Sequence, residues 1–203
     1  MEEYTSYLST LCKISTDDAN NEVMTELGFP IYNFDSVKRH YINRLFKSEE
    51  SCASCDGVLW NKYLKLLIEF KNGKKIDTKD IHIKVLNSLL ILCDINSCNI
   101  SDLKADLVFI LVYNEEKNPV KKEELTQYEK KRHDEVQESI NRDSICKYFC
   151  KNAKTEFVRY DLLKYKGLYF RDVHSYSQNE FEFWICKTLA TSLFGRYNCY
   201  FSD

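Results

Sequence analysis

The stretch that decides the fold is CDGVLWNKYLKLLIEFKNG, residues 55–73. It holds two short apolar runs, GVLW and YLKLLIEFK, which are joined at Asn61-Lys62. Such runs on both sides of a polar dipeptide predict a β-hairpin with a two-residue loop. Because side chains alternate between the two faces of a strand, Glu69 and Lys71 are neighbours on one face, which we expect to be the polar face.

The predicted register brings a second carboxylate near this pair. With a two-residue loop, Trp60 pairs with Tyr63 and, by extension, Asp56 pairs with Leu67. Asp56 then lies diagonally across from Glu69, at a spacing of about 7 to 8 Å. Two long side chains at that spacing can converge on a divalent cation, whose oxygen ligands lie at about 2.0 to 2.6 Å. Two carboxylates and an amine could hold Mg²⁺, orient a water and stabilise the transition state of phosphoryl transfer.

The segments next to the hairpin fit an α/β domain. We expect a helix over about 36–47 that is capped by Asp35, and a helix over about 78–93 that is capped by Thr78. The segment ADLVFILVY, residues 105–113, is almost continuously apolar and predicts a buried central strand. This order of elements predicts a mixed central β-sheet flanked by helices.

The C-terminal half completes what we expect to be a single domain of residues 1–203. A highly charged stretch at about 120–151 predicts a long, mostly exposed helix. A strand over 157–165 and an aromatic-rich helix from about Asn179 are expected within the C-terminal segment, about 155–195. No linker rich in glycine or proline separates these parts, since the chain has 5 Gly and 2 Pro.

Composition favours a folded protein inside the cell. Hydrophobic residues make up 44% of the chain and charged residues 30%, and the net charge is -2. These values exclude a disordered chain and a protein that coats nucleic acid by bulk positive charge, although a local basic patch stays compatible with them. The N-terminal sequence has no signal-peptide pattern, and the apolar runs are too short to span a bilayer. We therefore expect a cytoplasmic protein with no membrane partner.

Cysteines offer a further candidate site. Cys52-x2-Cys55 and Cys93-x4-Cys98 together have the ligand types of a zinc or iron–sulfur site, whereas buried reduced thiols explain the same residues without a metal. The total of 9 cysteines is odd, and the absence of an export signal favours reduced thiols. No zincin motif, serine elbow, Walker loop or dinucleotide fingerprint is present, so the corresponding enzyme classes have no support.

The pattern D-x12-E-x-K across a hairpin, followed by a helix and a buried strand, resembles the PD-(D/E)XK nuclease superfamily, also called restriction-endonuclease-like. The resemblance covers about residues 36–113 and implies the helix–sheet–helix–strand core of that superfamily. It implies that Asp56, Glu69 and the backbone carbonyl of Phe70 bind Mg²⁺ or Mn²⁺. It also implies that Lys71 positions the attacking water or neutralises charge.

Two departures from the superfamily's pattern affect this prediction. The residue before Asp56 is Cys55 instead of proline, and the sequence predicts no strand ahead of the Asp-bearing one. Members of the superfamily often add a glutamate from the first helix and a lysine or glutamine from the helix after the E-x-K motif. Here Glu49 or Glu50, and Lys84, are the candidates for these two roles.

The function that the resemblance implies is metal-dependent phosphodiester hydrolysis on nucleic acid, with DNA favoured over RNA, or a catalytically silent relative of such a nuclease. Lys71, Lys74, Lys75 and Lys79 would rim the site as a basic patch, whereas the KKRH run at 130–133 lies among acids and is typical of an ion-paired helix. The alternative function is a non-catalytic protein-interaction module that uses the charged helix and the aromatic C-terminal segment. A solvated strand face without chemistry also explains the acid–amine pair, and the oligomeric state stays open.

Overall fold

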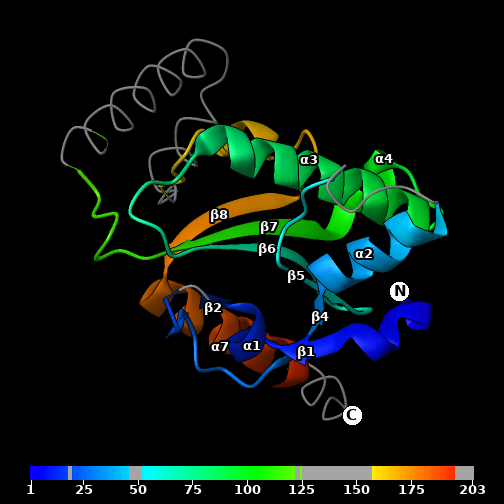
Figure 1. Cartoon of the computed structure of the whole chain (residues 1–203), viewed down its shortest axis with the longest axis horizontal. Helices are drawn as coiled ribbons and strands as arrows, with labels where there is room; N and C mark the ends of the chain where they lie inside the picture. The colour runs from blue at the N-terminus through cyan, green and yellow to red at the C-terminus, as the bar shows by residue number, and fades with distance from the viewer. Residues whose placement is uncertain (18–19, 46–51, 122–123, 125–156, 195–203) are drawn as a thin grey trace, which may run out of the picture.

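The computed structural model describes residues 1–17, 20–45, 52–121, 124 and 157–194. A six-stranded mixed sheet forms the centre of the molecule (Figure 1). Its strands lie in the order β1 (Leu8–Thr10), β4 (Pro30–Asn33), β5 (Gly57–Trp60), β6 (Lys65–Lys71), β7 (Leu107–Tyr113) and β8 (Asp172–Ser177). The pairs from β1 to β6 are antiparallel, whereas β6, β7 and β8 run parallel. The expected α/β class with a mixed sheet is confirmed.

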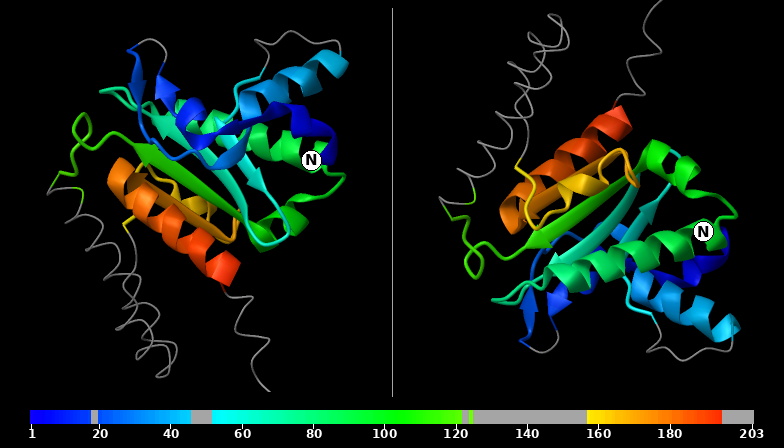
Figure 2. Two further views of the ribbon diagram at one scale, coloured as in Figure 1. Left: turned by 90° about the horizontal axis from the view of Figure 1, so that it is seen from below. Right: turned by 90° about the horizontal axis from the view of Figure 1, so that it is seen from above.

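Helices cover both faces of this sheet. They are η1 (Glu2–Tyr7), α1 (Leu11–Ile14), α2 (Phe34–Arg44), α3 (Thr78–Ile95), α4 (Ile100–Asp106), η3 (Leu163–Tyr165) and α7 (Gln178–Phe194). Figure 2 shows α3 in front when the sheet is seen from above and α7 in front when it is seen from below. A short ribbon of β2 (Thr16–Asp17) and β3 (Glu22–Val23) lies apart from the main sheet. The two helical layers therefore bury both faces of β6 and β7.

The two helices next to the hairpin form as the sequence predicts, but with other caps. The side chain of Asn33 accepts a hydrogen bond from Ser36 N and caps α2, so that Asp35 lies in the first turn. Asp77 caps α3 in place of Thr78. Asn33 and Asp77 both have extended backbone conformations, which suit the N-cap position. Helix α2 therefore begins one residue before Asp35, and α3 begins at Thr78, so each predicted cap lies inside its helix.

The hairpin forms with a longer loop than we predicted. Trp60 pairs with Lys65, so the loop holds four residues, 61–64, and the two-residue loop is wrong. The side-chain oxygen of Asn61 accepts hydrogen bonds from Tyr63 N at 2.8 Å and Leu64 N at 2.9 Å. An asparagine that bonds to backbone two and three residues ahead stabilises such a turn, and the sequence pattern alone does not reveal this.

The longer loop changes which residues face each other across the hairpin. Val58 pairs with Leu67 and Gly57 with Ile68, whereas Asp56 lies just before β5 and does not pair with Leu67 as predicted. Because the correction amounts to two residues along β6, the predicted division of side chains between the two faces is unchanged. Lys84 Nζ contacts both acids, at 2.8 Å from Glu69 Oε1 and 3.9 Å from Asp56 Oδ1, so the two carboxylates lie on the side of the hairpin that α3 covers.

The face that carries Glu69 is buried, and our prediction of a polar face is wrong. Leu67 packs with Val85 of α3 in one core cluster, while Ile68 packs with Phe181 of α7 in the other. The parallel pair β6–β7 requires a crossover helix, and α3 provides it and covers this face. The acid–amine pair therefore lies beneath a helix.

The strand predicted over 157–165 is wrong. The described residues there form a turn with positive φ at Tyr160 and Asp161, and then η3. Val158, Leu162 and Tyr165 are all buried, at helical rather than alternating spacing. The strand beside β7 is β8, whose sequence DVHSYS carries too few apolar residues to be recognised.

The N-terminal segment supplies the strand that the sequence analysis does not find. β4 pairs with β5 through Tyr32 opposite Val58 and Asn33 opposite Gly57. β1 then pairs with β4 and forms the edge of the sheet. β1 and β4 hold only three and four residues, which is too few for a clear alternating pattern.

Some predictions fall on residues outside the described ranges. Most of the charged helix at 120–151, the KKRH run at 130–133, and Glu49 and Glu50 belong to this group. Within the described ranges, no single helix has the length and hydropathy of a membrane span, although α3 and α4, which are bent by 106° to each other, meet that criterion as a pair. The predicted C-terminal helix is confirmed as α7.

Candidate functional site

Asp56 lies just before β5, and its carboxylate turns back onto β6. Asp56 N donates a hydrogen bond at 3.1 Å to the carbonyl of Ile68, the residue that pairs with Gly57, so Asp56 departs from the regular ladder. The amide of Phe70 donates to Asp56 Oδ2 at 2.6 Å. This bond holds the carboxylate against the peptide that follows Glu69. The side chain of Asp56 keeps 20% of its exposure, so it is the carboxylate of the pair that solvent reaches.

Glu69 is the buried member of the pair, with 0% exposure. Its Oε1 accepts from Lys84 Nζ at 2.8 Å and contacts Lys71 Nζ at 3.0 Å. Lys71 also binds Asp80 Oδ2 at 2.6 Å, and Lys84 Nζ lies 3.9 Å from Asp56 Oδ1. In the part of the chain that the structure describes, Glu69 Oε2 has no hydrogen-bond partner. A buried carboxylate oxygen without a partner is costly, and it needs a functional explanation.

The cluster contains three carboxylates and two amines. Burial and the neighbouring charge of Glu69 raise the pKa of Asp56 well above its ordinary value. Burial also raises the pKa of Glu69, against the opposing effect of Lys84 and Lys71. Burial alone would lower the pKa of each lysine, but the adjacent carboxylates outweigh it and raise both values. The two lysines therefore stay protonated, and the excess of acid favours one more positive charge.

The carboxylate oxygens at this site fit a hard divalent cation. Glu69 Oε2 accepts no hydrogen bond from the described residues, Asp56 Oδ1 lies 3.9 Å from Lys84 Nζ, and the carbonyl of Phe70 belongs to the same stretch of β6. Mg²⁺ prefers such oxygen ligands. No set of three or more His, Cys, Asp or Glu side chains is placed to hold a metal within the described ranges, so the fit depends on two carboxylates and a peptide oxygen.

A small cavity of about 210 Å³ adjoins the Asp56 end of the cluster. Its lining consists of Ile14, Ser15, Thr16, Asp17, Met24, Asp56, Phe70, Lys71 and Asn72. The side chain of Asn72 donates to Asp17 Oδ2 at 3.2 Å and to Glu22 Oε2 at 2.6 Å, which ties the β2–β3 ribbon to the end of β6. The sequence does not predict this wall, because Asp17 and Glu22 lie 55 and 50 positions before Asn72 in the chain.

The cysteines play a packing role at this site. Cys55 is buried, and its amide donates to Ser88 Oγ of α3 at 2.9 Å. Burial raises the pKa of the Cys55 thiol well above its ordinary value, which favours the neutral form. Cys52, Cys93 and Cys98 are free thiols that pack against the same core cluster. These contacts agree with the interpretation of buried reduced thiols and give no support to a thiolate metal site.

The other candidate residues of the sequence analysis lie apart from the acids. Lys74, Lys75 and Lys79 are exposed in the loop after β6 and in the first turn of α3. On the same helix, the Nδ1 of His82 lies 2.9 Å from the hydroxyl of Tyr165. Lys84, the candidate for the lysine that superfamily members often add from the helix after the E-x-K motif, does join the site. It lies on α3 and donates a hydrogen bond to Glu69.

Comparisons with protein-family models, with curated proteins and with solved structures give no match for this chain. The function therefore has to be argued from the groups at the site.

Proposed function

We propose that this chain is a metal-dependent phosphodiesterase that acts on nucleic acid, or a catalytically silent relative of such an enzyme, with the restriction-endonuclease-like core of the PD-(D/E)XK superfamily. The observation that carries the proposal is the meeting of Asp56, Glu69 and Lys71 at one end of β5 and β6, with Glu69 Oε2 lacking a partner among the described residues. A cation bound there would satisfy that oxygen and offset the excess of acid.

The sheet topology supports the proposed core. Three antiparallel strands, β4, β5 and β6, are followed by α3 as a crossover helix and by the parallel strand β7. Glu69 lies on β6 and Asp56 just before β5, and Lys84 projects from the crossover helix, as the resemblance implies. β4 lies beside β5 in the sheet, and α2 comes between these two strands along the chain.

The residues of this chain would divide the chemistry among them. Asp56, Glu69 and the carbonyl of Phe70 would hold Mg²⁺, which when bound supplies Lewis-acid activation of water and stabilises developing negative charge. The raised pKa of Lys71 keeps its amine protonated, so Lys71 orients the water or stabilises the phosphate oxygens and does not act as the base. Lys84 fixes the orientation of Glu69 through Oε1.

A catalytically silent relative would differ from an active enzyme in what neutralises the carboxylates, which is either the lysines alone or the lysines together with a metal ion. Lys71 and Lys84 already neutralise Glu69, and Asp80 engages Lys71. In a silent protein these pairs replace the metal, and nucleic acid is bound without hydrolysis. In an active enzyme the same lysines share the carboxylates with the ion.

The second candidate function, a non-catalytic protein-interaction module, is favoured by one exposed aromatic residue. Phe183 of α7 is 73% exposed, whereas Phe181 and Ile185 on the same helix are buried. A single exposed ring is common on protein surfaces, and it carries less weight than a buried acid cluster.

The test measures metal binding and cleavage together. Purified protein is titrated with Mn²⁺ by calorimetry and incubated with labelled DNA and RNA in Mg²⁺ or Mn²⁺. Asp56→Asn and Glu69→Gln should each reduce metal affinity and cleavage by about 100-fold or more, since even residues behind the ligands carry effects of about 10- to 100-fold. Asp106→Asn, which removes an exposed carboxylate beside Lys65 at the far end of β6, is the matched control.

The outcomes separate the versions of the proposal. Metal binding that depends on Asp56 without cleavage supports the silent relative. Cleavage of DNA but not RNA supports the substrate preference that we expect. If wild-type protein binds no metal, or if all three variants behave alike, the metal-dependent function is wrong.

A further inference from the structure

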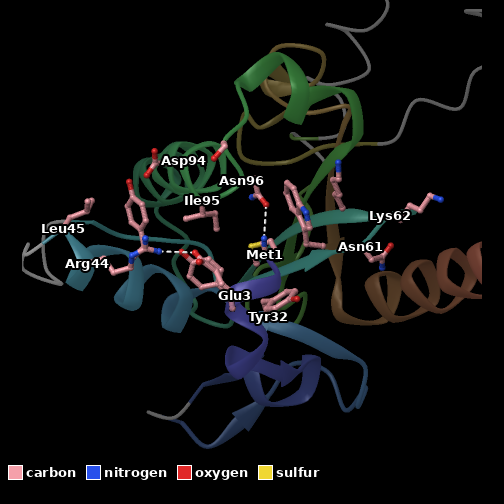
Figure 3. Close-up of a pocket in the computed structure, with 15 residues that line it drawn as sticks. Met1, Glu3, Tyr32, Arg44, Leu45, Asn61, Lys62, Asp94, Ile95 and Asn96 are labelled. Carbon is pink, nitrogen blue, oxygen red and sulfur yellow. Dashed lines mark hydrogen bonds and ion pairs between the residues drawn. The ribbon is translucent and has the colours of Figure 1, made fainter.

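A second cavity lies at the other end of β6, with a volume of about 1020 Å³ (Figure 3). Its lining consists of Met1, Glu3, Tyr4, Tyr32, Tyr41, Arg44, Leu45, Trp60, Asn61, Lys62, Lys65, Asp94, Ile95, Asn96 and Ser97. Lys65 and Glu69 are four residues apart on β6, which corresponds to about 13 Å along a strand. The cavity shares no lining residue with the acid cluster, so it is a separate place on the molecule.

Aromatic side chains from four elements line this cavity, one of them the buried Tyr4 of η1. Trp60 ends β5, Tyr32 belongs to β4 and Tyr41 to α2, and all three are half-buried. Rings that are partly covered by their neighbours keep a fixed orientation at a small cost in side-chain entropy. Their faces stack readily on planar aromatic ligands, and tryptophan and tyrosine are the residues on which bases stack in single-strand binding proteins.

Two lysines line the hairpin end of the cavity: Lys65 lies beside Trp60, and the Lys62 amine lies 5.9 Å from the centroid of the Tyr63 ring. Lys65 Nζ lies 5.0 Å from the centroid of the Trp60 ring and 3.0 Å from Asp106 Oδ2. Lys62 is exposed in the loop, and Figure 3 shows it with Asn61 on the side away from Asp94 and Arg44. An amine next to an aromatic ring matches a ligand that carries a phosphate next to a planar ring.

The acids of the cavity lie at the opposite end and are already engaged. Glu3 Oε1 accepts from Arg44 Nη1 at 3.1 Å. Burial and a hydrogen bond to Asp94 raise the pKa of Tyr41, so its hydroxyl stays protonated and holds that carboxylate. Of the three basic side chains in the lining, Arg44 pairs with Glu3 and Lys65 with Asp106, and Lys62 adds an exposed amine at the hairpin.

We propose that this cavity binds a nucleotide, with the base against Trp60 and the phosphate beside Lys62 and Lys65. The nucleotide is either free or part of a single strand, because both present an unstacked base with a phosphate attached. A duplex keeps its bases stacked inside and leaves the aromatic wall without a partner. The inference uses none of the residues of the proposed nuclease site and does not depend on that function.

The chain's two tryptophans make the test specific. Trp60 lies in the cavity, whereas Trp184 packs against His174 and Tyr176 beneath β8. Trp184→Phe leaves Trp60 as the sole tryptophan, and its fluorescence should be quenched by adenosine monophosphate or by a single-stranded oligonucleotide. Trp60→Phe leaves Trp184, whose emission should not change with either ligand. All titrations contain a chelator and are repeated in Asp56→Asn, so that the outcome is independent of the metal site.

Two variants test the two halves of the proposal, Trp60→Leu for base stacking and Lys62→Ala for the phosphate contact. Each should weaken nucleotide binding about fivefold or more, and the loss of stacking in Trp60→Leu can reach about 100-fold. Lys13→Ala, an exposed lysine on α1, is the matched control and should bind as wild type. Circular dichroism melting verifies that each variant is folded.

Five results bear directly on the proposal. Tighter binding of the oligonucleotide than of the mononucleotide supports a strand, and the reverse order supports a free nucleotide. Absence of Trp60 quenching by both ligands would overturn the proposal. Equal affinity for a duplex, or equal loss in Lys62→Ala and Lys13→Ala, would also overturn it.

Discussion

The two ends of β6 differ in how the fold treats charge. Glu69 and Lys71 at one end are enclosed by Asp80 and Lys84 of α3. Lys65 at the other end lies on the same face of the strand but borders an open cavity. The difference follows from α3, whose first half covers the acid end and whose C-terminal end borders the cavity. One alternating strand thus yields a closed ion-pair cluster and an open aromatic pocket.

The largest effect is expected at the closed end. Lys84→Met keeps the apolar stem but removes one of the two amines that neutralise Glu69. Breaking a buried ion pair costs about 3 to 5 kcal/mol, and we expect a loss of about 3 kcal/mol because Lys71 keeps its contact. Denaturant unfolding measures the change. Lys104→Met, at an exposed position of α4, should stay within about 0.5 kcal/mol of wild type, and an equal loss in both variants would contradict the enclosed cluster.

A smaller effect is expected at the open end. Asn61→Ala removes the acceptor for the amides of Tyr63 and Leu64, and we expect a loss of about 1 kcal/mol in the free energy of unfolding. Water reaches this loop and replaces part of the lost bonding. Asn61→Asp keeps an acceptor in the same position and should recover most of the stability. A loss as large as that of Lys84→Met would remove the energetic contrast between the two ends.

The smallest effect concerns pH and a histidine on the outer side of α3. Burial and the nearby Lys164 lower the pKa of His82, against a weaker opposing effect of Asp161. The folded state therefore favours the neutral ring, and the unfolded chain binds more protons just below pH 6.5. The stabilisation is present above that pH and is lost as the pH falls through it. Between pH 7.5 and pH 5, the melting temperature of the wild type should fall slightly more than that of His82→Gln. If the two melting temperatures fall by the same amount, His82 does not contribute to the pH dependence of stability.

The sequence predicts the elements that repeat a clear pattern. The stripe Ile81, Val85, Leu89 and Leu92 predicts α3, and all four residues are buried. The continuous run of 107–113 predicts the central strand β7, every residue of which is buried. Where the apolar pattern is short or polar, as in β1, β4 and β8, the sequence predicts no strand or the wrong segment. These strands are stabilised by pairing with neighbouring strands of the sheet, which their own sequence does not reveal.

What the sequence by itself determined is that Glu69 and Lys71 share one face of a strand, since the two-residue period of a strand holds in any environment. The tertiary structure decided the rest. The Asn61 turn set the register, and the crossover of α3 buried Glu69 and brought Lys84 to it. The β2–β3 ribbon added a wall from a distant part of the chain. The contacts of Lys84 with Glu69 and of Asn72 with Glu22 join residues 15 and 50 positions apart, and they follow from packing, which no local pattern encodes.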